Sequence, residues 1–188
     1  MPTEPDGRRA RGQETRRRLL DATVRVVGRD GPAAVTHRAV AAEAGLTKSL
    51  ATYHFATIDD LLTAALIECT EAYARQIAAD LPPDSSPADL AEHLAANINE
   101  HRQDWLAYYE LFLLAVRRPA LRAAALQWTK WTTSIARRYT DDPVAIDAFV
   151  SALDGLGVAA LLCDDPVDPR QLGRMFTYLL RGRQGKRG

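Results

Sequence analysis

The sequence predicts an all-α protein. No segment of convincing length alternates apolar and polar residues as a half-buried strand would, whereas apolar residues recur at helical spacing through most of the chain. Ser, Thr or Asp stands where several of these periodic segments begin, often just before a proline, as is typical of helix N-termini. Hydrophobic residues make up 47% of the 188 positions, which allows a sizeable core. We expect about nine helices.

The first elements are short and basic. Residues 1–12 are polar and rich in proline and glycine, so we expect a disordered arm there, either a solvated tail or an arm that contacts DNA. An amphipathic helix is predicted from Gln13 to about Arg29, where Gly31-Pro32 follows. Two short helices come next, opened by the N-cap residues Thr36 and Thr47, and the second ends near Phe55.

The remaining helices are longer. Thr57 is expected to cap a helix that runs to about Asp80, and the Pro82–Pro87 stretch breaks the chain after it. Further helices are predicted over residues 86–101, 105–116, 119–139, 143–163 and 168–181, followed by a basic, frayed tail over 181–188.

Residues 36–55 have the pattern of a helix-turn-helix. Gly45 stands between the two short helices, where the chain must turn sharply, and Leu46 fills the angle between them. Charge is distributed accordingly: residues 1–57 hold ten Arg or Lys and six Asp or Glu (+4), and residues 58–188 hold fourteen and eighteen (−4). The positive end is therefore the helix-turn-helix end, as neutralisation of phosphates requires.

Several motifs in this region resemble the DNA-binding domain of the TetR family of bacterial regulators. The resemblance covers roughly residues 13–66 and rests on Ala44-Gly45-Leu46-Thr47, Tyr53-His54-Phe55 and Asp60-Leu61-Leu62. Three departures are visible. Ile58 stands where many members carry a lysine that reaches a phosphate, Leu50-Ala51 replace a polar residue followed by Leu, and Thr52 replaces the first residue of a frequent Tyr-Tyr pair.

The expected partner is a double-stranded operator with an inverted repeat. Thr47, Lys48 and Tyr53 are expected to contact phosphates, whereas Ser49, Leu50 and Thr52 are placed for base edges. The other DNA-binding candidates are Arg17 in the first long helix, Thr36, His37 and Arg38 at the start of the preceding short helix, and His54, for which packing on the first helix is equally expected.

Residues 58–188 are predicted to form an effector-binding and dimerisation domain after a DNA-binding domain of residues 13–57. The resemblance implies a small-molecule pocket, for which the candidates are Trp105, Tyr108, Tyr109, Phe112, Trp128, Trp131 and Asp154. An ordinary aromatic core is the alternative. Glu110, Thr132 and Asp154 are candidate polar anchors. The resemblance also implies a homodimer through the last two helices, dense in apolar residues and containing Gly155 and Gly157.

The function predicted is that of a ligand-responsive cytoplasmic transcriptional regulator, more often a repressor in this family. Two alternatives remain: an interaction module that does not bind DNA, and an all-α enzyme. We expect no catalytic site, cofactor or metal, because His93 and His101 lie two helical turns apart and Gly155–Ala160 lacks the strand that a dinucleotide motif needs. Cys69 and Cys163 are expected to be reduced, and no apolar stretch is expected to span a membrane.

Overall fold

The computed structural model describes residues 4–180. Within that range it contains nine α-helices and two short 3₁₀-helices and no strand, so the prediction of an all-α fold with about nine helices is confirmed. The α-helices are α1 (Glu4–Asp30), α2 (His37–Glu43), α3 (Lys48–His54), α4 (Ile58–Asp80), α5 (Pro87–Glu100), α6 (Arg102–Arg117), α7 (Arg122–Ala136), α8 (Pro143–Leu162) and α9 (Pro169–Leu180). The 3₁₀-helices are η1 (Pro32–Ala34) and η2 (Pro119–Leu121).

The chain divides into two compact units. The first comprises the chain up to Cys69 together with Leu106–Ala125, and the second comprises Thr70–Trp105 together with the chain from Leu126 onwards. Helices α4, α6 and α7 therefore contribute residues to both units. The expected division after residue 57 differs from this one, because the start of α4 and most of α6 pack with the N-terminal helices. As a division of function, it stays a prediction.

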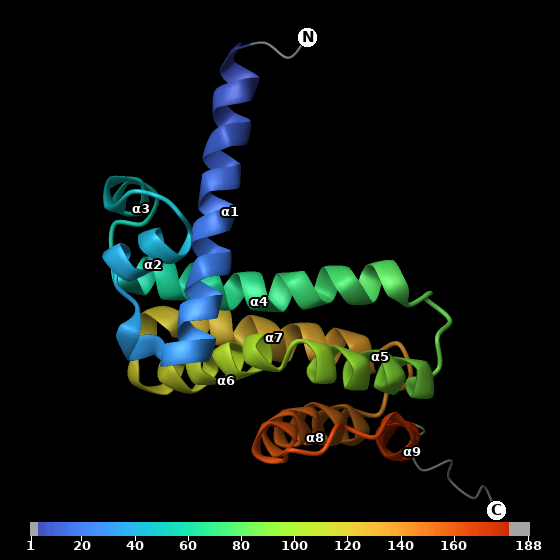
Figure 1. Ribbon diagram of the computed structural model, residues 1–188. Coiled ribbons are helices and arrows are strands. Elements are labelled where there is room, and N and C mark those ends of the chain that lie inside the picture. The colour runs from blue at the N-terminus through green and yellow to red at the C-terminus, as the bar shows by residue number, and fades with distance from the viewer. Residues whose placement is uncertain (1–3, 181–188) are drawn as a thin grey trace, which may run out of the picture. The chain divides into compact units, whose positions relative to one another are not determined.

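In the first unit, α1 packs on the two short helices α2 and α3 (Figure 1). Its buried face presents large apolar side chains at helical spacing to the fully buried Val40 of α2 and Ala51 of α3. These α1 residues are Leu19, Leu20, Val26 and Val27. Thr23 lies among them, and its buried hydroxyl donates to the Leu19 carbonyl at 2.7 Å, so the polar group is satisfied within its own helix.

Helix α1 begins much earlier than the sequence predicts. The expected disordered arm is wrong for residues 4–12, which form the first turns of α1, whereas residues 1–3 lie outside the described part of the chain. Pro5 falls in the first turn, where its missing N–H has no helical partner to lose. Gly7 and Gly12 each disfavour the helix by about 1 kcal/mol relative to alanine. The four residues between them are three arginines and an alanine, which all favour a helix.

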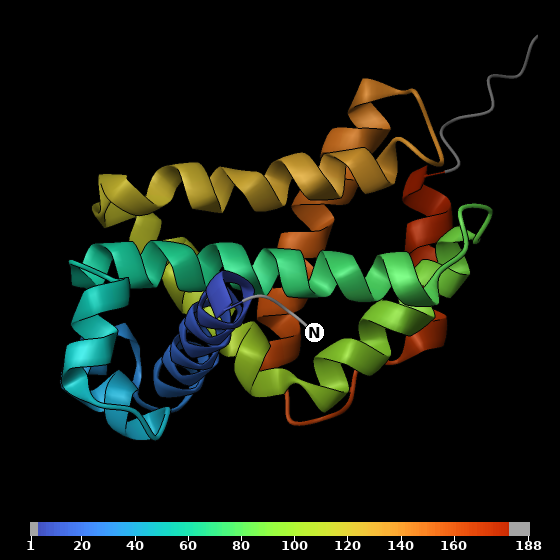
Figure 2. The ribbon, with the colours of Figure 1, turned by 90° about the horizontal axis from the view of Figure 1, so that it is seen from above.

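In the second unit, α5 packs closely on α9, and the two helices lie side by side in Figure 2. A Cβ atom added to Gly173 of α9 would lie 3.6 Å from the Cα of Ala88, so the small residue permits the close approach. Phe149 of α8 and Phe176 of α9 meet edge to face with ring centroids 4.9 Å apart, and both are buried. This apolar interior holds α5, α8 and α9 together.

Helix termini follow the predicted capping residues. The Thr57 hydroxyl accepts from the Asp60 N–H, while the Asp60 carboxylate accepts from the Thr57 N–H, both at 3.0 Å. Ser86 and Asp89 make the same reciprocal arrangement at the start of α5, and these hydrogen bonds hold the pKa of Asp89 below its ordinary value. Asp142 caps α8 by accepting from the Val144 N–H at 2.9 Å.

Candidate nucleic-acid interface and effector site

The turn between α2 and α3 is built from local hydrogen bonds. The Thr36 hydroxyl caps α2 by accepting from the Ala39 N–H at 3.0 Å. At the other end of α2, the Leu46 N–H donates to the Ala41 carbonyl and Gly45 adopts a φ of 64°, which completes a left-handed C-terminal cap. Thr47 then caps α3. The predicted helix-turn-helix is thus present, and glycine is required at position 45 by its backbone conformation.

Arginines of α1 hold this turn in place. Arg18 donates to the Ala44 carbonyl at 2.6 Å, which satisfies an acceptor at the C-terminal end of α2. Arg25 and Arg29 both pair with Glu43, at 2.9 and 3.0 Å, and they hold the pKa of that carboxyl below its ordinary value. Sequence reasoning missed these roles. The signal was the spacing of 18, 25 and 29, which places the three arginines on one side of α1.

Helix α3 presents one polar face to solvent and buries the other. Ala51 is fully buried, whereas the side chain of Tyr53 is 82% exposed. Apart from the half-buried His54, the residues predicted to contact DNA from this helix and its cap are exposed: Thr47, Lys48, Ser49, Leu50, Thr52 and Tyr53. Thr52 donates to the Lys48 carbonyl at 3.0 Å, so its methyl group and both lone pairs of its hydroxyl oxygen remain for a partner. The contacts of this face with DNA stay a prediction.

The other DNA-binding candidates are differently engaged. Arg17 is exposed but pairs with Glu14 and Asp21 on its own helix, at 2.8 and 3.3 Å, and Arg17 holds the pKa of Glu14 below its ordinary value. The Nε2 atom of His37 lies 2.8 Å from the Phe55 carbonyl oxygen, so this ring ties the start of α2 to the end of α3.

Three further candidates lie nearby. His54 is half-buried and meets Tyr53 edge to face. Thr36, the cap of α2, and Arg38 are exposed. Ile58, which replaces the family's lysine, is the first residue of α4 and half-buried, so the loss of a phosphate contact there stays a prediction.

An aromatic cluster lies in the second unit. The ring of Tyr73 in α4 lies 5.3 Å from Trp105, 6.2 Å from Trp128 and 5.5 Å from Trp131 between centroids, and its other neighbour is His93 at 5.8 Å. Sequence reasoning did not select Tyr73, because its aromatic neighbours come from three other helices.

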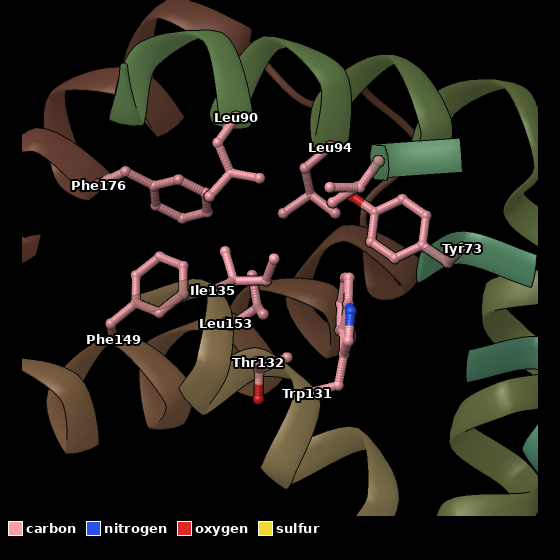
Figure 3. A pocket seen from close by; sticks show the side chains of 10 residues that line it. Tyr73, Leu90, Leu94, Trp131, Thr132, Ile135, Phe149, Leu153 and Phe176 are labelled. Carbon is pink, nitrogen blue, oxygen red and sulfur yellow. The ribbon is translucent and has the colours of Figure 1, made fainter. Parts of the chain in front are cut away.

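The cluster borders a small apolar cavity (Figure 3). Side chains from α4, α5, α7, α8 and α9 line it: Tyr73, Ile77, Leu90, Leu94, Trp131, Thr132, Ile135, Phe149, Leu153 and Phe176. Its volume of about 10 Å³ is close to what a single water molecule needs. A drug-sized ligand occupies a pocket of roughly 300–1,000 Å³. The site therefore admits such a ligand only after side chains or helices move.

Polar atoms around this interior are few. Asp154 of α8 accepts from the Trp128 indole N–H at 3.0 Å, and burial raises the pKa of this carboxyl while the hydrogen bond opposes the rise. The Tyr73 hydroxyl and His93 Nε2 are buried without a hydrogen-bond partner among residues 4–180, and burial raises the pKa of Tyr73. Thr132 donates to the Trp128 carbonyl at 3.0 Å.

The predicted ligand-binding residues are divided between the two compact units. Trp105, Trp128, Trp131 and Asp154 belong to the second unit, whereas Tyr108, Tyr109 and Phe112 belong to the first. There Tyr108 lies 5.0 Å from Tyr109 and 5.7 Å from Phe112 between ring centroids. The candidate anchor Glu110 is also in the first unit, where burial raises its pKa. Trp105 and Tyr108 are close in sequence but belong to different units, because the boundary between the units falls within α6.

Helix α8 carries an exposed stripe of small and apolar side chains. Ser151, Gly155, Val158, Ala159 and Leu162 recur at helical spacing and are all exposed, and nothing lies within 4 Å of a Cβ added to Gly155. The expectation that no apolar stretch approaches the length of a membrane span is wrong for this helix, which has 20 residues and contains an 18-residue stretch with a mean hydropathy of 1.8. The mean hydropathy of α8 is high because the helix has apolar side chains both on its buried face and on this exposed face.

No group of three or more His, Cys, Asp or Glu residues could hold a metal ion within the described range. Cys69 and Cys163 are free thiols.

The first unit holds a helix-turn-helix with an exposed polar recognition face, and the second unit surrounds an aromatic cavity. This combination is that of a DNA-binding regulator. Residues 19–65 match the model of the tetR family of bacterial regulatory proteins, and residues 85–182 match that of a tetracyclin repressor-like C-terminal domain. The chain belongs to the TetR family, whose members are transcriptional regulators.

Among solved structures, multidrug binding protein EbrR in complex with ethidium is 40% identical, with a TM-score of 0.74 over 88% of this chain and 98% of that chain. A TetR family member from Streptomyces coelicolor A3 is also 40% identical, with a TM-score of 0.79 over 88% and 98%. The transcriptional regulator BetI of Brucella canis is 30% identical over 101 residues, 50% of this chain and 51% of BetI. The match thus spans about half the length of that curated relative.

Proposed function

We propose that this protein is a repressor that binds an inverted-repeat operator as a homodimer and leaves it when a hydrophobic aromatic cation binds the second unit. The observation that carries the proposal is the exposed face of α3, held by a capped turn and by arginines of α1. Lys48 and Tyr53 would contact phosphates and fix the register, while Ser49, Leu50 and Thr52 would meet base edges. Such a protein acts in the cytoplasm, where operator DNA is found.

The exposed stripe of α8 supports the homodimer. Its small residues would let the same helix of a second copy approach closely, and Leu162 and Val158 would be removed from water. Tyr178 of α9 is 83% exposed and would extend this surface. A two-fold dimer places two recognition helices on half-sites about one helical turn of DNA apart, which matches an inverted repeat.

The aromatic interior of the second unit supports a cationic effector. Trp and Tyr faces attract cations, and the half-buried carboxylate of Asp154 would balance a positive charge that the apolar surroundings otherwise disfavour. EbrR, a relative at 40% identity, is a multidrug binding protein with a solved ethidium complex. Ethidium combines a planar aromatic ring system with a positive charge, so the same class of ligand fits the chemistry of this interior.

The closed cavity supports release by a population shift. Because the cavity has room for about one water molecule, the effector must bind a conformation in which Tyr73, Trp131 and their neighbours have moved apart. Tyr73 belongs to α4, the helix that also contributes Leu61 and Leu62 to the core of the first unit. A displacement at Tyr73 would then be transmitted along a continuous helix, and the ligand-bound conformation would hold DNA less tightly.

The first test selects genomic fragments with the purified protein at physiological salt, without ligand. Enrichment of a short inverted repeat supports the operator and the dimer. An interaction module that does not bind DNA would enrich none, and its partner binding would depend little on salt, whereas DNA binding weakens steeply as salt rises. Turnover of a metabolite would instead favour the enzyme, for which the described residues offer no catalytic constellation.

The second test titrates ethidium into the protein, and into the complex with the recovered repeat, by following intrinsic tryptophan fluorescence and operator anisotropy. Asp154→Asn should weaken ethidium binding about tenfold or more while a neutral aromatic compound binds as before, because the variant lacks the balancing charge. Equal losses for both compounds would refute the electrostatic role of Asp154. Ethidium also intercalates into DNA, so a duplex without the repeat serves as the control.

A further inference from the structure

The N-terminal part of α1 extends beyond the helix-turn-helix, which it contacts through Arg16 and Arg18 at its base. Leu19 is the first large buried side chain of α1, and Arg9 lies ten residues before it, which is about 15 Å along a helix. Figure 1 shows the first turns of α1 projecting beyond α2 and α3. Accordingly, nothing lies within 4 Å of a Cβ added to Gly12. This extension is defined here as residues 4–18.

The extension is basic. Residues 4–18 hold six arginines and three carboxylate residues, which gives a net charge of +3, and Glu14 pairs with Arg17. Arg9 and Arg11 are exposed, and neither makes an ion pair or side-chain hydrogen bond with the side chains that the structure describes, those of residues 7 and 9–180. Cations in the first turns of a helix oppose its dipole by about 0.3–1 kcal/mol each. Their position therefore disfavours the isolated helix and favours an anionic partner.

Helical periodicity places these two arginines on the same sides of α1 as the two arginines that contact the helix-turn-helix. Arg9 precedes Arg16 by seven residues and so lies on the same side of α1, and the Arg16 guanidinium stands 4.9 Å from the ring centroid of Phe55, at the end of α3. Arg11 precedes Arg18 by seven residues, and Arg18 bonds to the Ala44 carbonyl in the turn. The two rows thus flank the side of α1 that packs on the helix-turn-helix.

We propose that the α1 extension is a second DNA-contacting element, which binds phosphates of the duplex flanking each half-site through Arg9 and Arg11. The inference rests on the proposed operator binding. A 15 Å reach corresponds to about four base-pair steps of a duplex at 3.4 Å per step. Phosphate contacts carry no base code, so the extension adds affinity and salt dependence and leaves base preference unchanged.

The test compares two duplexes: the recovered inverted repeat alone, and the same repeat with about eight base pairs added on each side. For the natural protein, log affinity against log salt should be steeper on the longer duplex by about 0.9 for each added phosphate contact. Arg9→Gln with Arg11→Gln should abolish that difference and leave binding of the trimmed duplex unchanged. The control variant, Lys130→Gln with Arg137→Gln, removes two exposed charges from the second unit. It should preserve the difference in slope between the two duplexes.

A second pair of variants at Gly12 separates helix geometry from charge. Gly12→Ala retains a continuous helix, whereas Gly12→Pro interrupts it and keeps both arginines; neither meets a neighbouring side chain. Only the proline should reduce the flank-dependent slope. Equal slopes for the natural protein on the two duplexes would overturn the inference while leaving operator binding intact. Failure to recover any operator would overturn both proposals. If Lys130→Gln with Arg137→Gln lowered the slope as much as Arg9→Gln with Arg11→Gln, the effect would come from the net charge of the protein, and the inference would be overturned.

Discussion

At the scale of single residues, neighbouring positions on α3 serve opposite purposes. Ala51 is fully buried against the first unit's core, whereas Thr52 and Tyr53, the next two residues, face solvent. A helix turns about 100° per residue, so one short helix can both anchor itself and present a recognition surface. Residues on the exposed side can therefore be changed without disturbing the fold, which makes their roles separable by mutation.

Tyr53→Ala should weaken operator binding about tenfold for every sequence, because it removes a hydrogen bond to a charged phosphate worth about 1.5 kcal/mol. Thr52→Ala should instead change the preference at one or two base pairs, and the free energy of unfolding should stay within about 0.5 kcal/mol in both variants. Anisotropy with a panel of single-base operator variants measures both effects. Unchanged affinity in both variants would show that this face does not meet DNA.

Asp154→Asn should stabilise the protein at neutral pH. Burial raises the pKa of Asp154, so the folded protein holds this proton more tightly than the unfolded chain does. The resulting stabilisation is fully present below the ordinary aspartate pKa of about 3.9 and is lost as pH rises through the raised value. At pH 7 the variant should therefore unfold at a higher urea concentration than the natural protein. Below pH 4 the two unfolding midpoints should be the same. The exposed Asp147→Asn is the matched control on α8.

At the scale of elements, two arginines complete helix ends that the local sequence leaves open. Arg18 donates to a carbonyl at the end of α2, and Arg102 donates to three carbonyls at the end of α8, those of Ala160, Leu161 and Cys163, at 2.7–2.9 Å. The last carbonyls of a helix have no partner within it, and a cation there also interacts favourably with the helix dipole. Neither helix end is therefore defined by its nearest residues alone.

Arg102→Ala should lower the free energy of unfolding by about 1–2 kcal/mol, because the last turn of α8 loses its charged donor. Hydrogen exchange should locate the loss of protection at residues 160–163. Arg117→Ala removes an equally exposed arginine at the end of α6 and should change stability by less than about 0.5 kcal/mol. Equal destabilisation by the two variants would show that the carbonyl contacts of Arg102 contribute nothing specific.

At the scale of the whole molecule, the distribution of charge and apolar surface separates two kinds of contact. Residues 1–57, where DNA is expected, carry a net charge of +4 and residues 58–188 a net charge of −4, and an exposed apolar stripe lies on α8. A stripe with small residues at its centre favours a helix from a second copy over solvent.

Val158→Glu combined with Leu162→Glu should convert the proposed dimer to a monomer, because burying these carboxylates against a second copy would be unfavourable. Light scattering coupled to size exclusion measures the mass, and affinity for the inverted repeat should fall more than tenfold while helix content stays unchanged. Val116→Glu, an exposed apolar position in the first unit, should leave the mass unaltered. A double variant that remains dimeric would place the interface elsewhere.

The sequence by itself determined the features that depend on residues a few positions apart. Thr36, Thr47, Ser86 and Asp142 each cap the helix for which they were predicted, and Gly45 has the left-handed conformation that its turn requires. These interactions span two to four residues, so periodicity and capping rules identify them. The all-α fold and the recognition helix follow from the same local rules.

Only the tertiary structure decided which distant side chains meet. It paired Arg18 with the Ala44 carbonyl, brought Tyr73 to the tryptophans, and assigned Trp105 and Tyr108, three residues apart, to different compact units. It also continued α1 through residues 4–12, where glycine and proline indicated a disordered arm. The reason is physical: helical spacing tells which face of a helix is apolar, but the partner of that face depends on how all the helices pack together.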